Sequence, residues 1–179
     1  PVTFTVAATG SPAPTYQWRK DGAVITTASN ASYTINAVAV GDAGSYDVVV
    51  SNVAGSATSS AAGLTVTGTT SDGFVYSATM GAVTVTGYVG TVGALTIPTA
   101  ISGLPVTAIA NDAFKAKTTL TSVVIPGSVK SIGTYAFMGC SSLTSVTLSE
   151  GITSIANLAF QECTALAEVS IPASVTSIG

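Results

Sequence analysis

Histidine is absent from the 179 residues of this sequence, and its loss excludes several kinds of chemistry. Histidine is the usual general base of hydrolases and a common nitrogen ligand of zinc. Eight carboxylates remain, but nothing in their spacing brings two of them together as a glycosidase would need. Serine and threonine are abundant, yet a hydroxyl nucleophile requires an activating base. We therefore expect no enzyme activity, no catalytic residues, no metal site and no cofactor.

Charge is also scarce. Asp, Glu, Lys and Arg make up 7% of the chain, against about 25% in an average soluble domain. The five basic residues are scattered and form no stripe that could neutralise phosphates, so we expect no nucleic-acid partner. Runs of about 18 apolar residues are missing as well. We expect no membrane span in this segment and attribute its mean hydropathy of +0.60 to alternating strands.

Only two cysteines are present, and they lie 23 residues apart. This spacing gives Cys140 and Cys163 the same position in two successive repeats. We favour buried thiols, because free cysteine packs as a small hydrophobic residue. A disulfide remains the alternative.

What the sequence does contain is a repeat of fixed length. The stretch LTSVVIPGSVKSIGTYAFMGCSS (120–142) is followed by LTSVTLSEGITSIANLAFQECTA (143–165), and a third copy begins at Leu166. Such a period predicts stacked coils, in which each coil buries its apolar residues against the next one. The residues expected to point inward are Leu120, Leu143, Leu166, Val123, Val146, Val169, Ile125, Leu148, Ile171, Ile132, Ile155, Ile178, Phe114, Phe137 and Phe160.

Two segments upstream of the repeats extend this pattern. Residues 95–114 match a coil that carries about five extra residues, and we expect an irregular first coil there. Residues 73–90 alternate apolar and polar side chains, which predicts a β-hairpin that turns near Met80 and Gly81. This hairpin would cap the stack.

The repeat LTSVVIPGSVKSIGTYAFMGC and the preceding LTIPTAISGLPVTAI resemble the BspA-like leucine-rich repeats (LRR_5 type). The resemblance spans about residues 73–179. It implies a bacterial or protist surface or secreted protein whose repeats attach to host matrix proteins or to other cells. It brings no catalytic residues with it.

The first 66 residues show short alternating strands separated by turn residues, of which Asp21-Gly22 is the clearest. About seven such strands predict two packed antiparallel sheets. Trp18 follows Val6 by twelve residues, and the segment DAGSYDV (42–48) contains Tyr46. These features resemble an immunoglobulin I-set domain.

That resemblance implies particular roles. Val6 and Val48 stand where the family has its disulfide, and Trp18 would pack against them. Tyr46 would be the tyrosine corner, and Asp42 would brace its loop. Two valines can fill the space of the missing crosslink with hydrocarbon. The departure is compatible with a bacterial Ig-like module.

The predicted fold is therefore mainly β, an immunoglobulin-like β-sandwich followed by a leucine-rich-repeat solenoid. We expect the sandwich at 1–66 without its first strand, a linker at 67–73, and a solenoid at 74–179 with an N-terminal hairpin cap and an incomplete last coil. The chain would be a segment of a much longer protein.

A binding face, if there is one, is expected on the exposed side of the first strand in each coil. Solenoids present a long regular surface there. The alternative is that these small residues only suit a strand, and the sequence leaves both interpretations open. The residues concerned are Thr121, Ser122, Val124, Thr144, Ser145, Thr147, Ala167, Glu168 and Ser170.

Three functions remain open. The first is adhesion or protein–protein interaction by a non-catalytic segment of a large bacterial protein, at the cell surface or outside the cell, with an extracellular protein or polysaccharide as partner. The second is a structural stalk or surface-lattice component. The third is an accessory region of a secreted enzyme that degrades polysaccharides.

Overall fold

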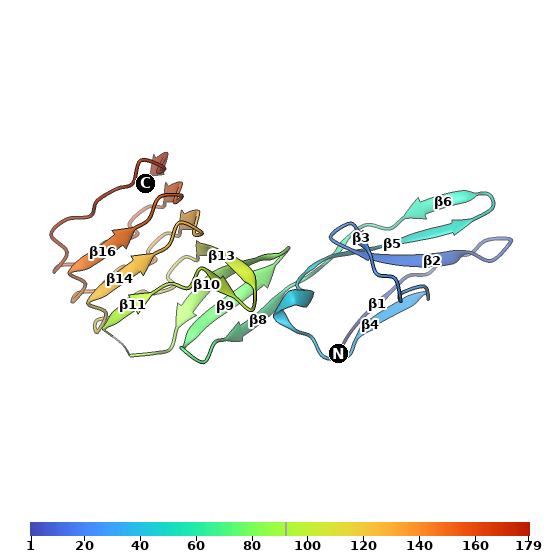
Figure 1. Ribbon diagram of the computed structural model, residues 1–179, viewed down its shortest axis with the longest axis horizontal. Helices are drawn as coiled ribbons and strands as arrows, with labels where there is room; N and C mark the ends of the chain where they lie inside the picture. Colours follow the sequence, from blue (N-terminus) through green and yellow to red (C-terminus); the bar gives the residue numbers. More distant parts are fainter. Residues whose placement is uncertain (92) are drawn as a thin grey trace. The chain divides into compact units, whose positions relative to one another are not determined.

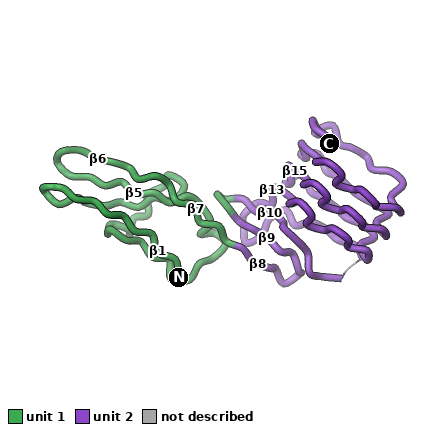
Figure 2. The backbone as a smooth tube through the Cα atoms, turned by 180° about the vertical axis from the view of Figure 1, so that it is seen from behind, with its two compact units in different colours: residues 1–66, 79–81 green, residues 67–78, 82–179 purple. Residues whose placement is uncertain are grey.

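The computed structural model describes residues 1–91 and 93–179, and it consists almost wholly of short β-strands (Figure 1). The chain divides into two compact units (Figure 2). Unit 1 comprises residues 1–66 and 79–81, and unit 2 comprises residues 67–78 and 82–179. The mainly β fold class, with an Ig-like region followed by a repeat solenoid, is confirmed.

Unit 1 contains two antiparallel sheets. The larger has the order β3-β2-β5-β6, with β7 also paired to β5, and the smaller joins β1 to β4. A single 3-10 turn, η1 (Val40–Asp42), precedes β5. The strands are β1 (Val2–Thr5), β2 (Thr15–Lys20), β3 (Ala23–Val24), β4 (Ser32–Ile35), β5 (Gly44–Asn52), β6 (Gly55–Thr58) and β7 (Ala62–Leu64).

The β2–β3 turn follows the sequence prediction. Asp21 and Gly22 have φ angles of 50° and 82°. Positive φ at both central residues is the requirement of a two-residue hairpin turn whose twist matches that of the strands. Asp21 also accepts a hydrogen bond from the Ser45 amide at 2.8 Å, which fixes the turn to the start of β5.

The core of unit 1 forms around Trp18, which is 3% exposed and packs with Ala28 and Val48. Val6 is half-buried at the margin of this cluster, so the two valines do occupy hydrocarbon beside the tryptophan. The hydroxyl of Tyr46 donates to the carbonyl of Asp42 at 2.8 Å. The carboxylate of Asp42 in turn accepts the amide of Ala39 at 2.8 Å. The roles implied for these residues are confirmed.

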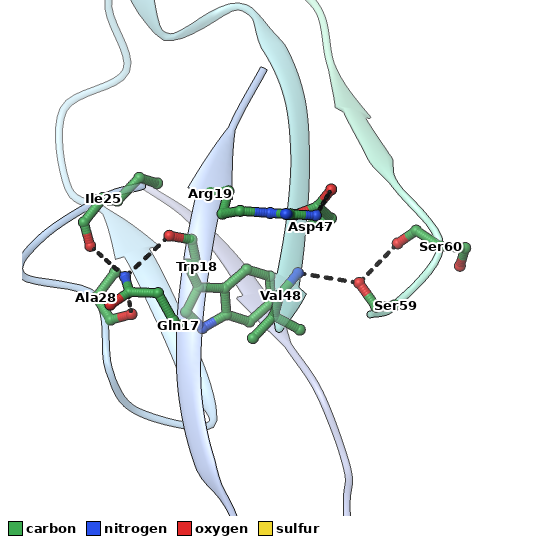
Figure 3. Close-up of polar contacts among 9 residues, drawn as sticks. All are labelled: Gln17, Trp18, Arg19, Ile25, Ala28, Asp47, Val48, Ser59 and Ser60. Carbon is green, nitrogen blue, oxygen red and sulfur yellow. Dashed lines mark hydrogen bonds and ion pairs between the residues drawn. The ribbon is translucent and has the colours of Figure 1, made fainter. Parts of the chain in front are cut away.

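Polar contacts hold the strands around this core in place (Figure 3). The amide group of Gln17 donates to the carbonyls of Trp18, Ile25 and Ala28, which ties the segment after β3 to β2. Arg19 on β2 and Asp47 on β5 face each other and form two hydrogen bonds, of 2.6 and 2.9 Å. This paired geometry fixes the register of the two central strands.

Unit 2 has two sheets, of which only the larger extends from the hairpin cap to the last coil. The three-stranded sheet has the parallel order β11-β14-β16. The larger sheet has the order β18-β17-β15-β13-β10-β9-β8. Its strands β10, β13, β15, β17 and β18 run parallel to one another, and β12 pairs with β13 in the antiparallel sense. The strands are β8 (Val66–Thr69), β9 (Phe74–Thr79), β10 (Ala82–Tyr88), β11 (Ala94–Thr96), β12 (Ala100–Ile101), β13 (Leu104–Ile109), β14 (Ser122–Ile125), β15 (Ser131–Ile132), β16 (Ser145–Leu148), β17 (Ser154–Ile155) and β18 (Ser177–Ile178).

Within the repeats, the register of both sheets equals the sequence period of 23 residues. Ser122 pairs with Ser145 in one sheet, and Ser131 pairs with Ser154 in the other. Identical positions therefore lie directly above one another. The predicted inward residues of the first copy are buried, whereas Leu148 and Phe160 of the second copy are half-buried. In the third copy the prediction is wrong for Ile171 and Ile178, which are exposed, and Leu166 and Val169 are half-buried. The predicted hairpin cap forms as β9 and β10, with Met80 and Gly81 at its turn.

A column of phenylalanines runs through the coils. The rings of Phe114 and Phe137 are stacked 4.9 Å apart, and those of Phe137 and Phe160 are 5.3 Å apart. The two cysteines are free thiols beside this column. The sulfurs of Cys140 and Cys163 donate to the carbonyls of Phe114 and Phe137, each at 3.2 Å. Burial raises the pKa of the Cys140 thiol to about 11, so it stays protonated at neutral pH.

The bends of the coils use left-handed backbone at two fixed positions. The first carries Asp112, Tyr135 and Leu158, with φ between 57° and 59°. The second position, four residues later in each coil, has positive φ as well, and it holds glycine only in the middle coil. Most of these residues bear a side chain, so glycine spacing does not reveal the bends.

Two parts of unit 2 differ from expectation. The expected linker at 67–73 is a strand and a turn, because β8 extends to Thr69 and Thr70 bonds to Phe74 through both backbone and hydroxyl. In the third copy, residues 166–170 form no strand. Position 167 is alanine, so it lacks the threonine hydroxyl that bridges coils at the equivalent position 144. The five-residue insertion of the first coil forms the β12–β13 hairpin.

Gly127 provides a test of the close stacking of coils. An added Cβ at this position would overlap the carbonyl oxygen of Glu150 in the next coil. We expect Gly127→Ala to lower the free energy of unfolding by about 1–3 kcal/mol, measured by urea denaturation. Gly87→Ala is the control, because its Cβ would meet Val75 at an ordinary 3.5 Å and should change stability little. Equal effects of the two changes would contradict this account.

Because Tyr46 is buried, we expect the stability of unit 1 to fall at high pH. Burial, followed by the nearby charge of Asp42, raises the pKa of Tyr46 to about 12, above its ordinary value of about 10. Between these values the folded state holds a proton that the unfolded state has lost, so stability falls as pH rises through this window. Tyr46→Phe should cost about 1 kcal/mol at neutral pH, and its deficit should shrink from pH 9 to pH 11 in urea denaturation. A deficit independent of pH would be evidence against the shifted pKa.

Candidate interaction surface

The outer face of the three-stranded sheet is the surface predicted from the repeats. Leu95, Val123 and Val146 point into the stack, so the residues beside them point outward. The outward residues form two rows across the strands, one through Ser122 and Ser145 and the other through Val124 and Thr147. We call this surface the ladder face, and it comprises Ala94, Thr96, Ser122, Val124, Ser145 and Thr147.

The predicted residues are distributed unevenly over this surface. Eight of the nine are exposed, while Ser122 is half-buried. Thr121 and Thr144 precede their strands, and both hydroxyls are occupied. Thr121 donates to the carbonyl of Gly93 at 2.8 Å, and Thr144 donates to the carbonyl of Thr121 at 3.0 Å. These two threonines therefore bridge coils.

The predicted residues of the third coil lie outside the sheet. Ala167, Glu168 and Ser170 are exposed, but no strand forms at these positions. The sequence-based prediction also missed β11, whose outward residues Ala94 and Thr96 extend the two rows. Their position could have been found, since the alignment of Ile97 with Ile125 places Thr96 opposite Val124.

The ladder face carries hydroxyl, methyl and isopropyl groups and no charge. Residues within a row repeat at the strand spacing of about 4.8 Å, and each strand is hydrogen-bonded to its neighbours. Such a surface has no group for acid–base chemistry. It can make van der Waals contacts and neutral hydrogen bonds with a partner that is itself regular.

The charged side chains lie outside the ladder face. Lys115 pairs with Asp112 at 2.8 Å and lies over the ring of Tyr135 at 5.3 Å, on the bends of the coils. Its hydrogen bond to Asp112 raises the pKa of Lys115. Among residues 1–91 and 93–179, no three His, Cys, Asp or Glu side chains gather in a way that could hold a metal ion. No helix in this part of the chain is long and apolar enough to cross a membrane.

Known proteins are similar to separate parts of this chain. The model of the BspA type leucine-rich repeat region matches residues 106–179, and that of an immunoglobulin domain matches residues 1–52. A leucine-rich repeat protein from Bacteroides capillosus is 35% identical, with a TM-score of 0.60 over 63% of this chain and 87% of that one. The chain belongs to the BspA-type leucine-rich repeat family.

Other similar proteins are longer than the matched region. The T. pallidum leucine-rich repeat protein is 35% identical with a TM-score of 0.56, over 64% of this chain and 50% of that one. A leucine rich cell surface protein of Faecalibacterium prausnitzii is 30% identical with a TM-score of 0.55, over 63% of this chain and 32% of that one. The decoration protein of Escherichia phage T5 is 50% identical over 52 residues, which is 28% of this chain and 32% of the relative. The chain thus spans half or less of these three proteins.

Thr144 and Thr147 allow a threonine that bridges two coils to be compared with an exposed threonine on the ladder face. Thr144→Val removes the hydroxyl that bridges two coils, and we expect it to cost about 0.5–1.5 kcal/mol of unfolding free energy. Thr147→Val, at an exposed position on the strand that follows Thr144, should change stability by less than about 0.5 kcal/mol. Urea denaturation of both variants measures the difference. A neutral Thr144→Val would contradict the bridging role.

Proposed function

We propose that this chain is a non-catalytic binding segment of a bacterial cell-surface or secreted protein, and that it attaches through the ladder face to an extracellular protein or polysaccharide. Leucine-rich repeat proteins of this type are suited to protein–protein interaction, because a solenoid offers an extended and rigid surface. The observation that carries the proposal is the in-register, uncharged rows of the ladder face.

The properties of the ladder face suit adhesion. Its backbone is ordered by hydrogen bonds on both sides of β14, so a partner orders no loop when it binds. Its neutral side chains require no counter-charge from the partner. Its regular spacing favours partners with repeated groups, such as an extended strand or a sugar polymer. The bacterial relative described as a cell surface protein supports the location.

Several properties of the remaining side chains support a non-catalytic role. The chain has no histidine, and its buried thiols are held protonated. Asp47 and Asp112 are engaged in ion pairs with Arg19 and Lys115. Carboxylates neutralised in this way serve structure, since a general base must be free to accept a proton.

A second candidate is a structural role as a stalk or surface-lattice component. It is favoured by the similarity to a phage decoration protein. The low charge of the chain also permits close packing of copies side by side. In this case the ladder face would meet other copies of the same protein.

Binding of the full chain to panels of matrix proteins and polysaccharides, measured by surface plasmon resonance, tests adhesion. The variant Val124→Lys with Thr147→Lys adds two charges to one row of the ladder face, on the neighbouring strands β14 and β16. The control, Ser141→Lys with Gln161→Lys, adds the same charge at exposed positions on the bends. We expect saturable binding that falls at least tenfold in the first variant and persists in the second.

Other results would contradict the proposal. Equal loss in both variants would assign binding to net charge and not to the ladder face. Absence of binding to every panel member by the folded chain would contradict adhesion. Self-association that the ladder variant abolishes would support the stalk or lattice role instead.

A further inference from the structure

We propose that unit 2 binds one neutral sugar ring, such as the end of a glycan chain, in a cavity between the β8–β9 turn and the β12–β13 hairpin. We call it the turn cavity, and its volume is about 380 Å³. One wall consists of residues 69–72 and Tyr76, and the other consists of Pro98 and residues 100–102. All of these residues belong to unit 2, and none of them is part of the ladder face.

Tyr76 supplies the observation that points to a ligand. The residue is 8% exposed, and its hydroxyl has no hydrogen-bond partner within residues 1–91 and 93–179. Among the side chains of this part of the chain that are not exposed, Ser128 Oγ is the only polar atom that is both sealed from solvent and without a partner. The Tyr76 hydroxyl is therefore reached from solvent, and the cavity that it lines gives the access. Because a buried tyrosine hydroxyl usually has a partner, this one is available to a ligand.

Gly68 on β8 makes room for this hydroxyl. A Cβ added at Gly68 would lie 2.7 Å from the hydroxyl oxygen of Tyr76 and 3.0 Å from the ring carbon that bears it. The oxygen therefore lies against the backbone of β8, beside Thr69 on the cavity wall. Packing and not a polar contact holds the ring in place. A ligand can thus gain a hydrogen bond to Tyr76 without breaking another one.

The wall that carries Asp72 is a turn closed by three hydrogen bonds. The amide of Gly73 donates to the carbonyl of Thr70 at 3.0 Å, and the amide of Thr70 donates to the carbonyl of Phe74 at 2.9 Å. The hydroxyl of Thr70 accepts the amide of Phe74 at 3.0 Å. Asp72 is exposed on this turn and takes part in none of the ion pairs of the described residues. Its carboxylate is in place to accept hydrogen bonds from a ligand.

The opposite wall is built by the insertion in the first coil. The five extra residues form the β12–β13 hairpin, and Ser102 and Gly103 at its turn have φ angles of 50° and 82°. These angles are those of a tight two-residue hairpin turn. Ile101 is 6% exposed and anchors the hairpin to the stack. Insertions in repeat proteins commonly form loops on the binding face, and the two full repeats that follow lack this one.

The lining defines the chemistry of the ligand. Its hydroxyl groups can both donate and accept hydrogen bonds, whereas the carboxylate of Asp72 only accepts. The hydroxyls of a sugar ring have the same double character, and two neighbouring ones can donate to one carboxylate. Pro98 and Ala100 offer apolar contacts to the C–H groups of the ring. The hydroxyls that the turn does not use are those of Thr69, Ser71, Tyr76 and Ser102.

Charge and size narrow the ligand class further. The lining has one carboxylate and no basic residue, so it disfavours phosphate, sulfate and sugar acids. An ammonium group only donates, so it would leave the donor capacity of the hydroxyls unused. The volume is near the lower end of the range of about 300–1,000 Å³ for small-molecule sites, which suits one ring better than a stretch of polymer.

Titration of the isotope-labelled full chain with the methyl glycosides of glucose, galactose, mannose and N-acetylglucosamine, followed by NMR, tests the site. We expect saturable shifts of the amide signals of residues 69–73 and 99–103 with at least one of the four. Tyr76→Phe removes only the hydroxyl and should weaken this binding by about threefold or more. Tyr88→Phe is the matched control, because Tyr88 is also buried, at 7% exposed, but does not line the cavity. It should leave binding unchanged.

A second set of measurements tests the charge of the site. Asp72→Ala should weaken binding, whereas Glu168→Ala, at an exposed position of the third coil, should not. The methyl glycoside of glucuronic acid adds a carboxylate and should not bind. Equal binding of this compound would overturn the assignment to neutral sugars. Tighter binding of butylammonium chloride at the same amides would assign the cavity to a cation instead.

Three further results would overturn the proposal. They are the absence of saturable shifts with all four glycosides, shifts confined to the ladder face, and binding by Tyr76→Phe that equals that of Tyr88→Phe. The Val124→Lys, Thr147→Lys variant should bind the glycosides as the unaltered chain does. A failure of the turn cavity is therefore distinguishable from a failure of attachment through the ladder face.

Discussion

The structure of unit 2 depends on the burial of each coil by its neighbour. A single coil presents Leu, Val, Ile and Phe on its inner side and cannot cover them alone, so stability resides in the interfaces between coils. The column of Phe114, Phe137 and Phe160 is the clearest case, because each ring is covered by the ring of the adjacent coil. The same constraint imposes the 23-residue register on both sheets, and through it the regular rows of the ladder face.

Unit 1 is stabilised in another way. Its core joins Trp18, Ala28 and Val48 with a group of aromatic rings, in which Phe4 stacks on Tyr46 at 4.5 Å. Contacts between residues distant in sequence, such as the Arg19–Asp47 pair, hold the sheet together. Loss of one contact here affects one region. In the solenoid, loss of a contact at a repeated position weakens the packing of a coil against both of its neighbours.

Much of this architecture could be predicted, because the relevant signals are local or periodic. The period of 23 gives the stacking register, and Asp21-Gly22 gives a turn. The segment 42–48 resembles a tyrosine corner, and Tyr46 forms one. The left-handed bends could not be predicted, since Tyr135 and Leu158 adopt positive φ only because adjacent coils hold the backbone there. The strand at 67–69 was missed because its composition is that of a linker.

The candidate site was predicted in part for the same reasons. Alternation along β14 and β16 identifies the outward rows, but it cannot tell that the hydroxyls of Thr121 and Thr144 are occupied by carbonyls of adjacent coils. Those hydrogen bonds depend on tertiary structure that no single segment encodes.

The two cysteines have a consequence for where this protein can fold. Each sulfur is buried and donates to a phenylalanine carbonyl of the preceding coil, and in unit 1 Val6 and Val48 pack with Trp18. No covalent bond has to form for either unit to reach its structure. Folding of either unit therefore needs no oxidant and no disulfide isomerase, and the covalent structure of each unit does not depend on the redox state of the surrounding solution.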